Sequence, residues 1–282
     1  MIIDFHTHII PQHIKENRSR YAQLDPAFEA IYSNPQAKLA TAEELIEAMD
    51  KDGVDIAVVL NYGWKTQLLC AEVNDYIIES VHRYPDRLVG CCSVQPESMD
   101  NAVYEIQRCA EAGIKGVGEI RPDAQLFDFT HPESMKPLVK VLQDNDLILL
   151  THASEPVGHI YPGKGKATPE LLYNFIKAYP DVKVVCAHWG GGLPFFVLMP
   201  EVREALNNVY FDTAASPFLY DTRIYSQVVQ LVGADKILFG SDYPLIPQRR
   251  YLKEIDSIGL SQEHKENILY RNAARLLGLA DR

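Results

Sequence analysis

The sequence predicts a (β/α)8 barrel, the fold also called a TIM barrel, and three observations support this fold class. Eight short runs are apolar and rich in β-branched residues, as expected of parallel strands that are covered on both faces. A helical pattern separates each run from the next, and 282 residues suffice for one barrel of about 250 residues. The predicted strands are residues 2–8, 54–60, 88–94, 114–120, 147–152, 182–188, 209–213 and 236–242. We therefore expect residues 1–282 to form a single domain.

The first strand ends in His6-Thr7-His8 and so carries two histidines one residue apart. Successive side chains of a strand point to opposite faces, so His6 and His8 project from the same face and could share one metal ion. Asp4 precedes His6 at the same spacing, one layer deeper, and we interpret it as a structural hydrogen-bonding group. The two histidines are half of a metal site, which other parts of the chain have to complete.

A long segment, residues 10–40, follows the first strand. It contains three prolines and scattered aromatic residues but little periodicity. Connections of this length are usually functional or disordered. The aromatic side chains favour a loop or lid over the barrel, while a helical turn or two packed on the barrel rim is an equally good interpretation.

Several helix boundaries are marked in the rest of the chain. Thr41 and Glu44 have the spacing of a capping box, and Gly53 would end the helix that they begin. Later helices begin at Thr168, which a proline follows, and at Ser261. The last predicted helix carries Ile268, Leu269, Ala273, Leu276 and Leu277 at helical spacing. A doubly wound open sheet is the alternative fold, but it would need a GxGxxG turn after an early strand, and the sequence has none.

Composition limits the class of protein and of partner. Hydrophobic residues make up 47% and charged residues 23%, values that fit a globular protein with a sizeable core. The net charge of -11 disfavours nucleic acid or an anionic membrane as the main partner, because the general field repels phosphate. We therefore expect a small-molecule substrate, and homo-oligomerisation stays open.

Cysteine usage and hydropathy bear on the compartment. The five cysteines show no CxxC spacing, which indicates reduced thiols and not a disulfide or thiolate-zinc framework. No stretch approaches the roughly 18 apolar residues of a membrane span, and the first residues lack a basic signal-peptide start. These features predict a cytoplasmic protein.

Several predicted strands end in a residue that can bind a metal or move a proton. These residues are His6, His8, Glu119, His152, His188 and Asp242. In barrel enzymes the active site lies at the carboxyl ends of the strands, so these side chains should converge. A single histidine there is more often a hydrogen-bonded structural residue than a ligand, but the whole set favours a site. Imidazoles with a carboxylate and no thiolate suit Zn²⁺ or another divalent transition ion.

The segments 4–11, 187–194 and 239–244, with 267–269 and 272–278, together resemble the amidohydrolase superfamily. The nearest branch is the amidohydrolase-related group that includes aminocarboxymuconate-semialdehyde decarboxylase. The resemblance implies metal ligands at His6, His8, His152 and Asp242. It also implies that His188 lies beside the bound water or substrate, and that Asp242 takes the proton from the attacking water. Zn²⁺ is the expected cofactor, as one or two ions.

Glu119 departs from the decarboxylase pattern and resembles the glutamate that ends strand four in TatD-like hydrolases, where it can hold a second metal ion. The structural alternative is that Glu119 pairs with Arg121 or a loop amide. Two negative charges 4 Å apart repel by about 4 kcal/mol at an effective dielectric constant near 20. Glu119 beside a substrate carboxylate would therefore disfavour decarboxylation, and this charge favours hydrolysis.

The loop after the fifth strand, residues 153–166, leaves directly from His152. It offers His159 and Tyr161 as substrate-binding residues together with His188, although a solvated surface loop is the alternative. The sequence thus predicts a metal-dependent hydrolase that activates water for attack on an ester, lactone or amide carbon, with Asp242 and His188 as catalytic residues. The alternatives are a nonoxidative decarboxylase of an unsaturated or aromatic carboxylate, and a non-catalytic barrel that binds metal or ligand.

Overall fold

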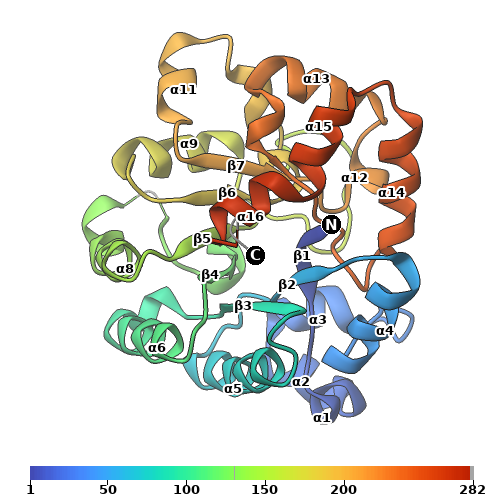
Figure 1. Ribbon diagram of the computed structural model, residues 1–282. Coiled ribbons are helices and arrows are strands. Elements are labelled where there is room, and N and C mark those ends of the chain that lie inside the picture. Colours follow the sequence, from blue (N-terminus) through green and yellow to red (C-terminus); the bar gives the residue numbers. More distant parts are fainter. Residues whose placement is uncertain (130, 280–282) are drawn as a thin grey trace.

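In a computed structural model, eight parallel strands form a barrel that helices surround (Figure 1). The structure describes residues 1–129 and 131–279. Each strand pairs with the next one along the chain, so the predicted (β/α)8 barrel is confirmed. The strands are β1 (Ile3–His8), β2 (Ile56–Leu60), β3 (Leu88–Cys92), β4 (Gly116–Ile120), β5 (Ile148–Thr151), β6 (Val184–Cys186), β7 (Val209–Asp212) and β8 (Ile237–Leu238).

The barrel closes where β1 meets the segment that follows β8. The backbone N–H of Asp242 donates to the carbonyl of His6 over 2.9 Å, and the N–H of His8 donates to the carbonyl of Tyr243 over 2.7 Å. Thr7 and Tyr243 form a parallel bridge at the same place. Backbone hydrogen bonds therefore join two predicted site residues, His6 and Asp242, across the seam of the barrel.

Sixteen α-helices and four shorter or irregular helical turns connect the described strands. The α-helices are α1 (Gln12–Glu16), α2 (Arg18–Leu24), α3 (Pro26–Tyr32), α4 (Ala42–Asp52), α5 (Gln67–Arg83), α6 (Met99–Glu111), α7 (Pro122–Gln125), α8 (Pro132–Asp144), α9 (Pro169–Ala178), α10 (Ala187–Gly190), α11 (Pro200–Ala205), α12 (Ser216–Leu219), α13 (Arg223–Val232), α14 (Gln248–Ser257), α15 (Gln262–Glu266) and α16 (Asn272–Leu276). The other turns are η1 (Pro96–Ser98), η2 (Leu193–Phe196), η3 (Ala234–Lys236) and the π-helical η4 (Asn267–Arg271).

The predicted capping box of α4 is present. The Thr41 hydroxyl accepts from the backbone N–H of Glu44, the Glu44 carboxylate accepts from the N–H of Thr41, and Gly53 ends the helix with φ 76°. The last predicted helix differs from expectation because η4 interrupts it. The carbonyl of Ile268 accepts from the backbone N–H of Phe239 over 2.9 Å, so this turn bonds to the end of β8.

Residues 10–40 contain the short helices α1, α2 and α3, so the helical interpretation of this segment describes it better than an irregular loop. These helices pack on the residues that follow β2. The ring of Phe28 stacks on Trp64 with centroids 5.1 Å apart, and the ring centroid of Tyr32 lies 4.7 Å from that of Tyr62. The segment also covers the barrel, because part of α3 lines the cavity described below.

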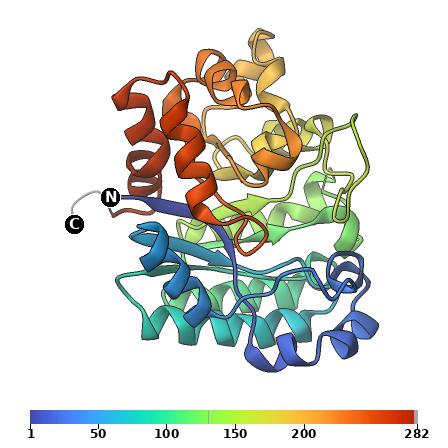
Figure 2. The same cartoon turned by 90° about the vertical axis from the view of Figure 1, so that its right-hand side faces the viewer.

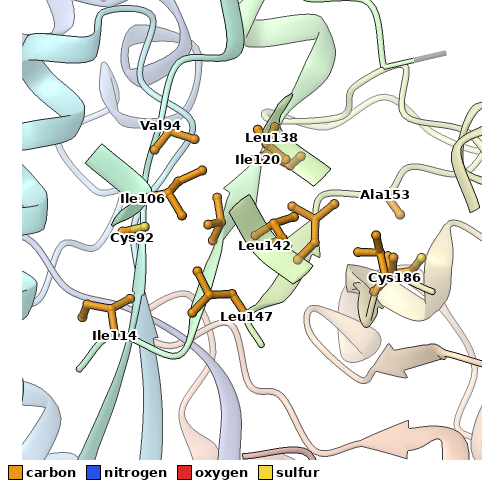
Figure 3. Close-up of a cluster of buried hydrophobic side chains, with 14 of the residues drawn as sticks. Cys92, Val94, Ile106, Ile114, Ile120, Leu138, Leu142, Leu147, Ala153 and Cys186 are labelled. Atoms are coloured by element: carbon orange, nitrogen blue, oxygen red, sulfur yellow. The ribbon is translucent and has the colours of Figure 1, made fainter. Parts of the chain in front are cut away.

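The largest hydrophobic cluster lies between the strands and the outer helices. Figure 3 shows part of it, in which Ile106 of α6 and Leu138 of α8 lie among residues of the strands such as Cys92 and Ile120. Each such side chain stabilises the fold by about 1.5–3 kcal/mol when fully buried. A second cluster joins residues of β1, β2, β5 and β6 with α16.

The two ends of the barrel differ. The N-terminus lies at one end, and α1 to α3 together with the loop after β5 lie at the other (Figure 2). Residues at the carboxyl ends of parallel strands share one edge, which here is the end beneath α1 to α3. Within residues 1–129 and 131–279, no helix is both long enough and apolar enough to cross a membrane.

Candidate active site

The structure brings all the predicted strand-end residues together at one end of the barrel. His6 and His8 come from β1 and Glu119 from β4. His152 directly follows β5, and His188 and Asp242 lie in the segments after β6 and β8. The histidines and Glu119 are buried, each no more than 6% exposed. This set is the candidate active site.

Three of these side chains converge on one point. Nε2 of His6 lies 3.1 Å from Nε2 of His8, which in turn lies 3.2 Å from Oδ1 of Asp242. The same carboxylate oxygen is 4.0 Å from Nε2 of His6. Two imidazole lone pairs this close repel unless a cation or a proton lies between them. The geometry therefore fits a metal ion.

Glu119 links this group to the remaining histidines. Its Oε1 accepts from Nδ1 of His152 over 2.7 Å and lies 3.5 Å from Nε2 of His188, while its Oε2 lies 3.9 Å from Nε2 of His8. Nε2 of His152 is also engaged, 3.0 Å from the hydroxyl of Ser154. Glu119 belongs to both clusters whose ligand atoms are close enough to hold an ion.

Asp212, at the end of β7, orients two histidines of the site by accepting hydrogen bonds from them. Its Oδ2 accepts from Nδ1 of His6 over 2.8 Å, and its Oδ1 accepts from the backbone N–H of His188 over 2.9 Å. Burial alone would lower the pKa of His6, but Asp212 and the other carboxylates raise it to about 10. The hydrogen bond fixes the tautomer of His6 so that Nε2 faces His8.

The charges of the cluster depend on one another. Burial alone would raise the pKa of Asp242, but His8 and His6 lower it to about 2. Burial alone would likewise raise the pKa of Glu119, yet His152 and the other histidines hold it well below its ordinary value. Burial opposes charge on His188 also, but Glu119 and Asp242 raise its pKa to about 9. The carboxylates thus stay ionised and attract cations.

Two candidate catalytic residues have an uncommon backbone conformation. His188 has φ 54° and Asp242 has φ 61°, and neither is glycine. Non-glycine residues rarely adopt positive φ, and such conformations often occur where a side chain has to be aimed at a site. His188 lies two residues after the end of β6 and Asp242 four residues after the end of β8, and both side chains line the cavity at the barrel mouth.

A cavity of about 570 Å³ opens above the cluster. His159 and Tyr161, predicted to bind substrate, both line it, and Tyr161 donates a hydrogen bond of 2.9 Å to Glu155. Asp4 has the expected structural role, because its carboxylate accepts from Ser241 and Gln248 and it is not among the residues that line the cavity.

Sequence reasoning missed three residues of the site. Asp212 carries a usable signal, since it is a carboxylate at the end of a predicted strand. Tyr62 stacks on His8 with ring centroids 4.7 Å apart, and Arg121 lines the cavity two residues after Glu119. The last two lie in connecting segments, where residue type alone does not indicate a functional role.

A family model described as amidohydrolase matches residues 3–279, nearly the whole chain. The chain belongs to the amidohydrolase family. It is therefore an enzyme of the amidohydrolase superfamily, and the resemblance seen in the sequence motifs is confirmed. The described donor set, with histidines and carboxylates, suits a divalent metal ion.

Individual relatives narrow the chemistry. A 2-amino-3-carboxymuconate-6-semialdehyde decarboxylase of Dictyostelium discoideum is 25% identical over 98% of this chain and 91% of its own. A gamma-resorcylate decarboxylase of Polaromonas is 22% identical over 73% of this chain and 75% of its own. A crystal structure of 5-carboxyvanillate decarboxylase from Novosphingobium aromaticivorans, with manganese and 4-hydroxy-3-methoxy-5-nitrobenzoic acid, has a TM-score of 0.81, 20% identity, and coverage of 99% of this chain and 96% of that one.

The prediction of hydrolysis is wrong, because these relatives, which match most of the chain, are decarboxylases. The error lies in the charge assigned to Glu119. Its Oε1 accepts from His152 over 2.7 Å and faces His188, so the charge that was expected to repel a substrate carboxylate is already offset by neighbouring imidazoles. Arg121, offered as its structural partner, does not form an ion pair with it within the described residues.

Proposed function

We propose that the protein is a divalent-metal-dependent decarboxylase that removes carbon dioxide from an aromatic or conjugated carboxylate without an oxidant. The single observation that carries the proposal is the match along 98% of the chain to a decarboxylase of an unsaturated amino acid semialdehyde. The aromatic acids named for the other relatives extend the substrate class to hydroxylated benzoates.

The shape of the cavity supports a planar substrate. Its walls include the rings of Tyr32, Tyr62 and Phe218, and its floor carries the ionisable cluster. Small-molecule sites typically combine apolar walls with a few polar groups that fix orientation, in volumes of roughly 300–1,000 Å³. A ring between these walls would place one edge against the cluster.

The cluster also supplies the ligands of the proposed metal ion. His6, His8, His152 and Asp242 would hold it, and Glu119 would hold or bridge to a second ion. A bound divalent cation offers positive charge to the oxygen atoms of an anionic substrate. Zn²⁺ and Mn²⁺ both suit imidazole with carboxylate, and we propose one or two ions per chain.

Decarboxylation exchanges a bond to the carboxyl carbon for a bond to hydrogen. A proton adds to the carbon that bears the carboxylate, carbon dioxide leaves, and the electron pair of the broken bond returns to the conjugated system. The site therefore needs an acid that reaches the cavity. The side chain of Asp242 is 14% exposed, against 0% for His6 and 5% for His8 and Glu119.

We assign Asp242 as the group that relays this proton: its ionised carboxylate first takes a proton from solvent and then passes it to the carbon that bears the substrate carboxylate. His188 also lines the cavity, and Asp212 and Ala214 hold it by its backbone N–H and by Nδ1. Nε2 of His188, 3.5 Å from Oε1 of Glu119, faces the cavity and would donate a hydrogen bond to a substrate oxygen. His159 and Tyr161 contact the distal part of the substrate in this proposal.

The test is an assay of carbon dioxide release by protein reloaded with Zn²⁺ or Mn²⁺ after chelation. The substrates are hydroxylated benzoates and conjugated dienoic acids, with lactones and amides as the comparison. We expect carbon dioxide from at least one acid and, in D₂O, one deuterium on the carbon that lost the carboxylate. Hydrolysis of the comparison compounds without any carbon dioxide release would refute the proposal.

Three broader expectations remain proposals. We propose that residues 1–282 act as one domain, of which Thr130 and residues 280–282 lie outside the described residues. Cytoplasmic location is supported by five cysteines that are all buried and free. We also propose that the chain forms a homo-oligomer.

A further inference from the structure

Arg121 is a cation inside the cavity. It follows β4 directly, is 5% exposed, and lines the same space as Glu119 and His152. Arginine keeps its positive charge at all ordinary pH values. A charged side chain that is this well buried normally has an anionic partner.

The protein supplies few partners for this guanidinium. Nη2 donates to the carbonyl of Gly163 over 2.7 Å, and Nε is buried and has no hydrogen-bond partner among the residues that the structure describes. Within residues 1–129 and 131–279, no carboxylate lies within 4.0 Å of its nitrogens. Leaving a buried charge unpaired costs several kcal/mol, so a site of this kind is built for a ligand.

The side chain is nevertheless held in place. The backbone N–H of Arg121 donates to Oε1 of Gln125 over 2.9 Å, and Gly163 belongs to the loop after β5. The hydrogen bond from Nη2 to the carbonyl of Gly163 therefore holds the guanidinium at the cavity wall before any ligand arrives. A planar fork of donors fixed in this way matches the two oxygens of a carboxylate.

We propose that Arg121 binds a second acidic group of the substrate, one that does not react. This inference rests on the proposed decarboxylase function and narrows its substrates to aromatic or conjugated acids that carry two anionic groups. One group is lost as carbon dioxide at the cluster, and the other pairs with Arg121.

The reacting carboxylate is the wrong partner for Arg121. During decarboxylation its negative charge passes to the conjugated system, so a cation paired with it stabilises the starting state more than the transition state. Arg121 stabilises a carboxylate or phenolate that keeps its charge throughout the reaction equally in the starting state and in the transition state. Binding of that group positions the substrate without slowing the reaction.

The test compares ligands that differ in one charge. The holoenzyme is titrated with each of the three benzenedicarboxylates and with its mono-amide, which has nearly the same shape. In the wild type, we expect at least one dicarboxylate to bind about 10-fold or more tightly than its mono-amide. One hydrogen bond to a charged group changes the affinity by about that factor.

Arg121→Met should abolish this preference, and Arg121→Lys should keep part of it because the charge remains. Lys38→Met is the matched control, since Lys38 also lines the cavity but is exposed, and an exposed cation contributes little. We expect it to change the preference by about twofold or less. Metal content and melting temperature of every variant show whether the site and fold are intact.

The inference is overturned if the wild type binds no dicarboxylate more tightly than its mono-amide. It is also overturned if the Arg121→Met variant, with metal content and melting temperature intact, keeps the full preference. Complete loss of the preference in an intact Arg121→Lys variant, which keeps the positive charge, would overturn it as well. The anion site and the decarboxylase function can fail separately. One such outcome is a preference for the dicarboxylate that depends on Arg121 while no acid releases carbon dioxide. The anion site would stand, and the decarboxylase assignment would fall.

Discussion

Oδ2 of Asp212 accepts a hydrogen bond of 2.8 Å from Nδ1 of His6, and both side chains are completely buried. The two residues come from β7 and β1 and are 206 residues apart in the sequence. In the neutral imidazole that could bind a metal ion, this bond keeps the proton on Nδ1 and leaves the Nε2 lone pair directed at His8 and Asp242. Asp212 thus sets the orientation of the candidate metal centre without belonging to it.

Asp212→Asn should weaken metal binding by about 10- to 100-fold, because an amide is a poorer partner for Nδ1–H and no longer favours the required tautomer. Competition with a chromogenic chelator measures the affinity. Asp181→Asn, at an exposed position, is the control and should bind metal as the wild type does. Equal affinities in both variants would limit Asp212 to a packing role.

Removal of two ligands should empty the centre. We expect His6→Ala combined with His8→Ala to abolish both the bound ion and turnover, since each lost imidazole takes away a direct ligand bond. Elemental analysis of the purified protein gives the stoichiometry, which should be about one divalent ion per chain or more in the wild type. Full occupancy in the double variant would mean that the ion binds elsewhere.

His188 should separate chemistry from metal binding. His188→Asn should keep most of the metal while turnover falls by about 10²-fold or more, because a neutral amide donates a weaker hydrogen bond to the substrate oxygen than a protonated imidazole does. Steady-state kinetics and metal analysis on the same preparation give both quantities. Unchanged turnover in this variant would mean that His188 has a structural role and does not act in the reaction.

Acid stability should depend on Glu105, far from the centre. Burial alone would raise its pKa, but hydrogen bonds from Arg108 and Asn74 lower it. Its contribution is therefore complete above the ordinary pKa of about 4.3 and is lost as pH falls through the lowered value. Urea unfolding should show Glu105→Gln less stable than wild type by about 1–3 kcal/mol at pH 7, with the difference shrinking near pH 3.

The control for this experiment is Glu111→Gln, at the exposed end of the same helix. Its stability should stay within about 0.5 kcal/mol of the wild type. A Glu105→Gln deficit that is the same at both pH values would indicate lost packing and not a lost charge.

The strands were predictable because each is buried on both faces, so its apolar run stands out from the flanking polar sequence. The ends of the strands were less predictable than their positions. The last predicted strand covers residues 236–242, but β8 spans Ile237–Leu238. Helices α1, α2 and α3 are five to seven residues long, which is too short to display a clear 3.6-residue period. Their order depends on aromatic contacts with the chain after β2.

The candidate site was predictable where residue type and strand position coincide, as for His152 and Asp242. Arg121 and Tyr62 escaped because their roles arise from contacts with distant segments. The same reason explains the incorrect choice of hydrolysis. The charge of Glu119 was counted alone, whereas His152, its hydrogen-bond partner, lies 33 residues away in the sequence.

The seam of the barrel has a consequence for how the protein is made. His6 and His8 are synthesised more than 200 residues before Asp242 and the segment that closes the barrel against them. A growing or truncated chain therefore carries half of an ion-binding centre. Because a complete ligand set binds an ion far more tightly than a partial one, ion capture favours the last step of barrel assembly. Cellular metal supply would then influence how much of the newly made enzyme matures.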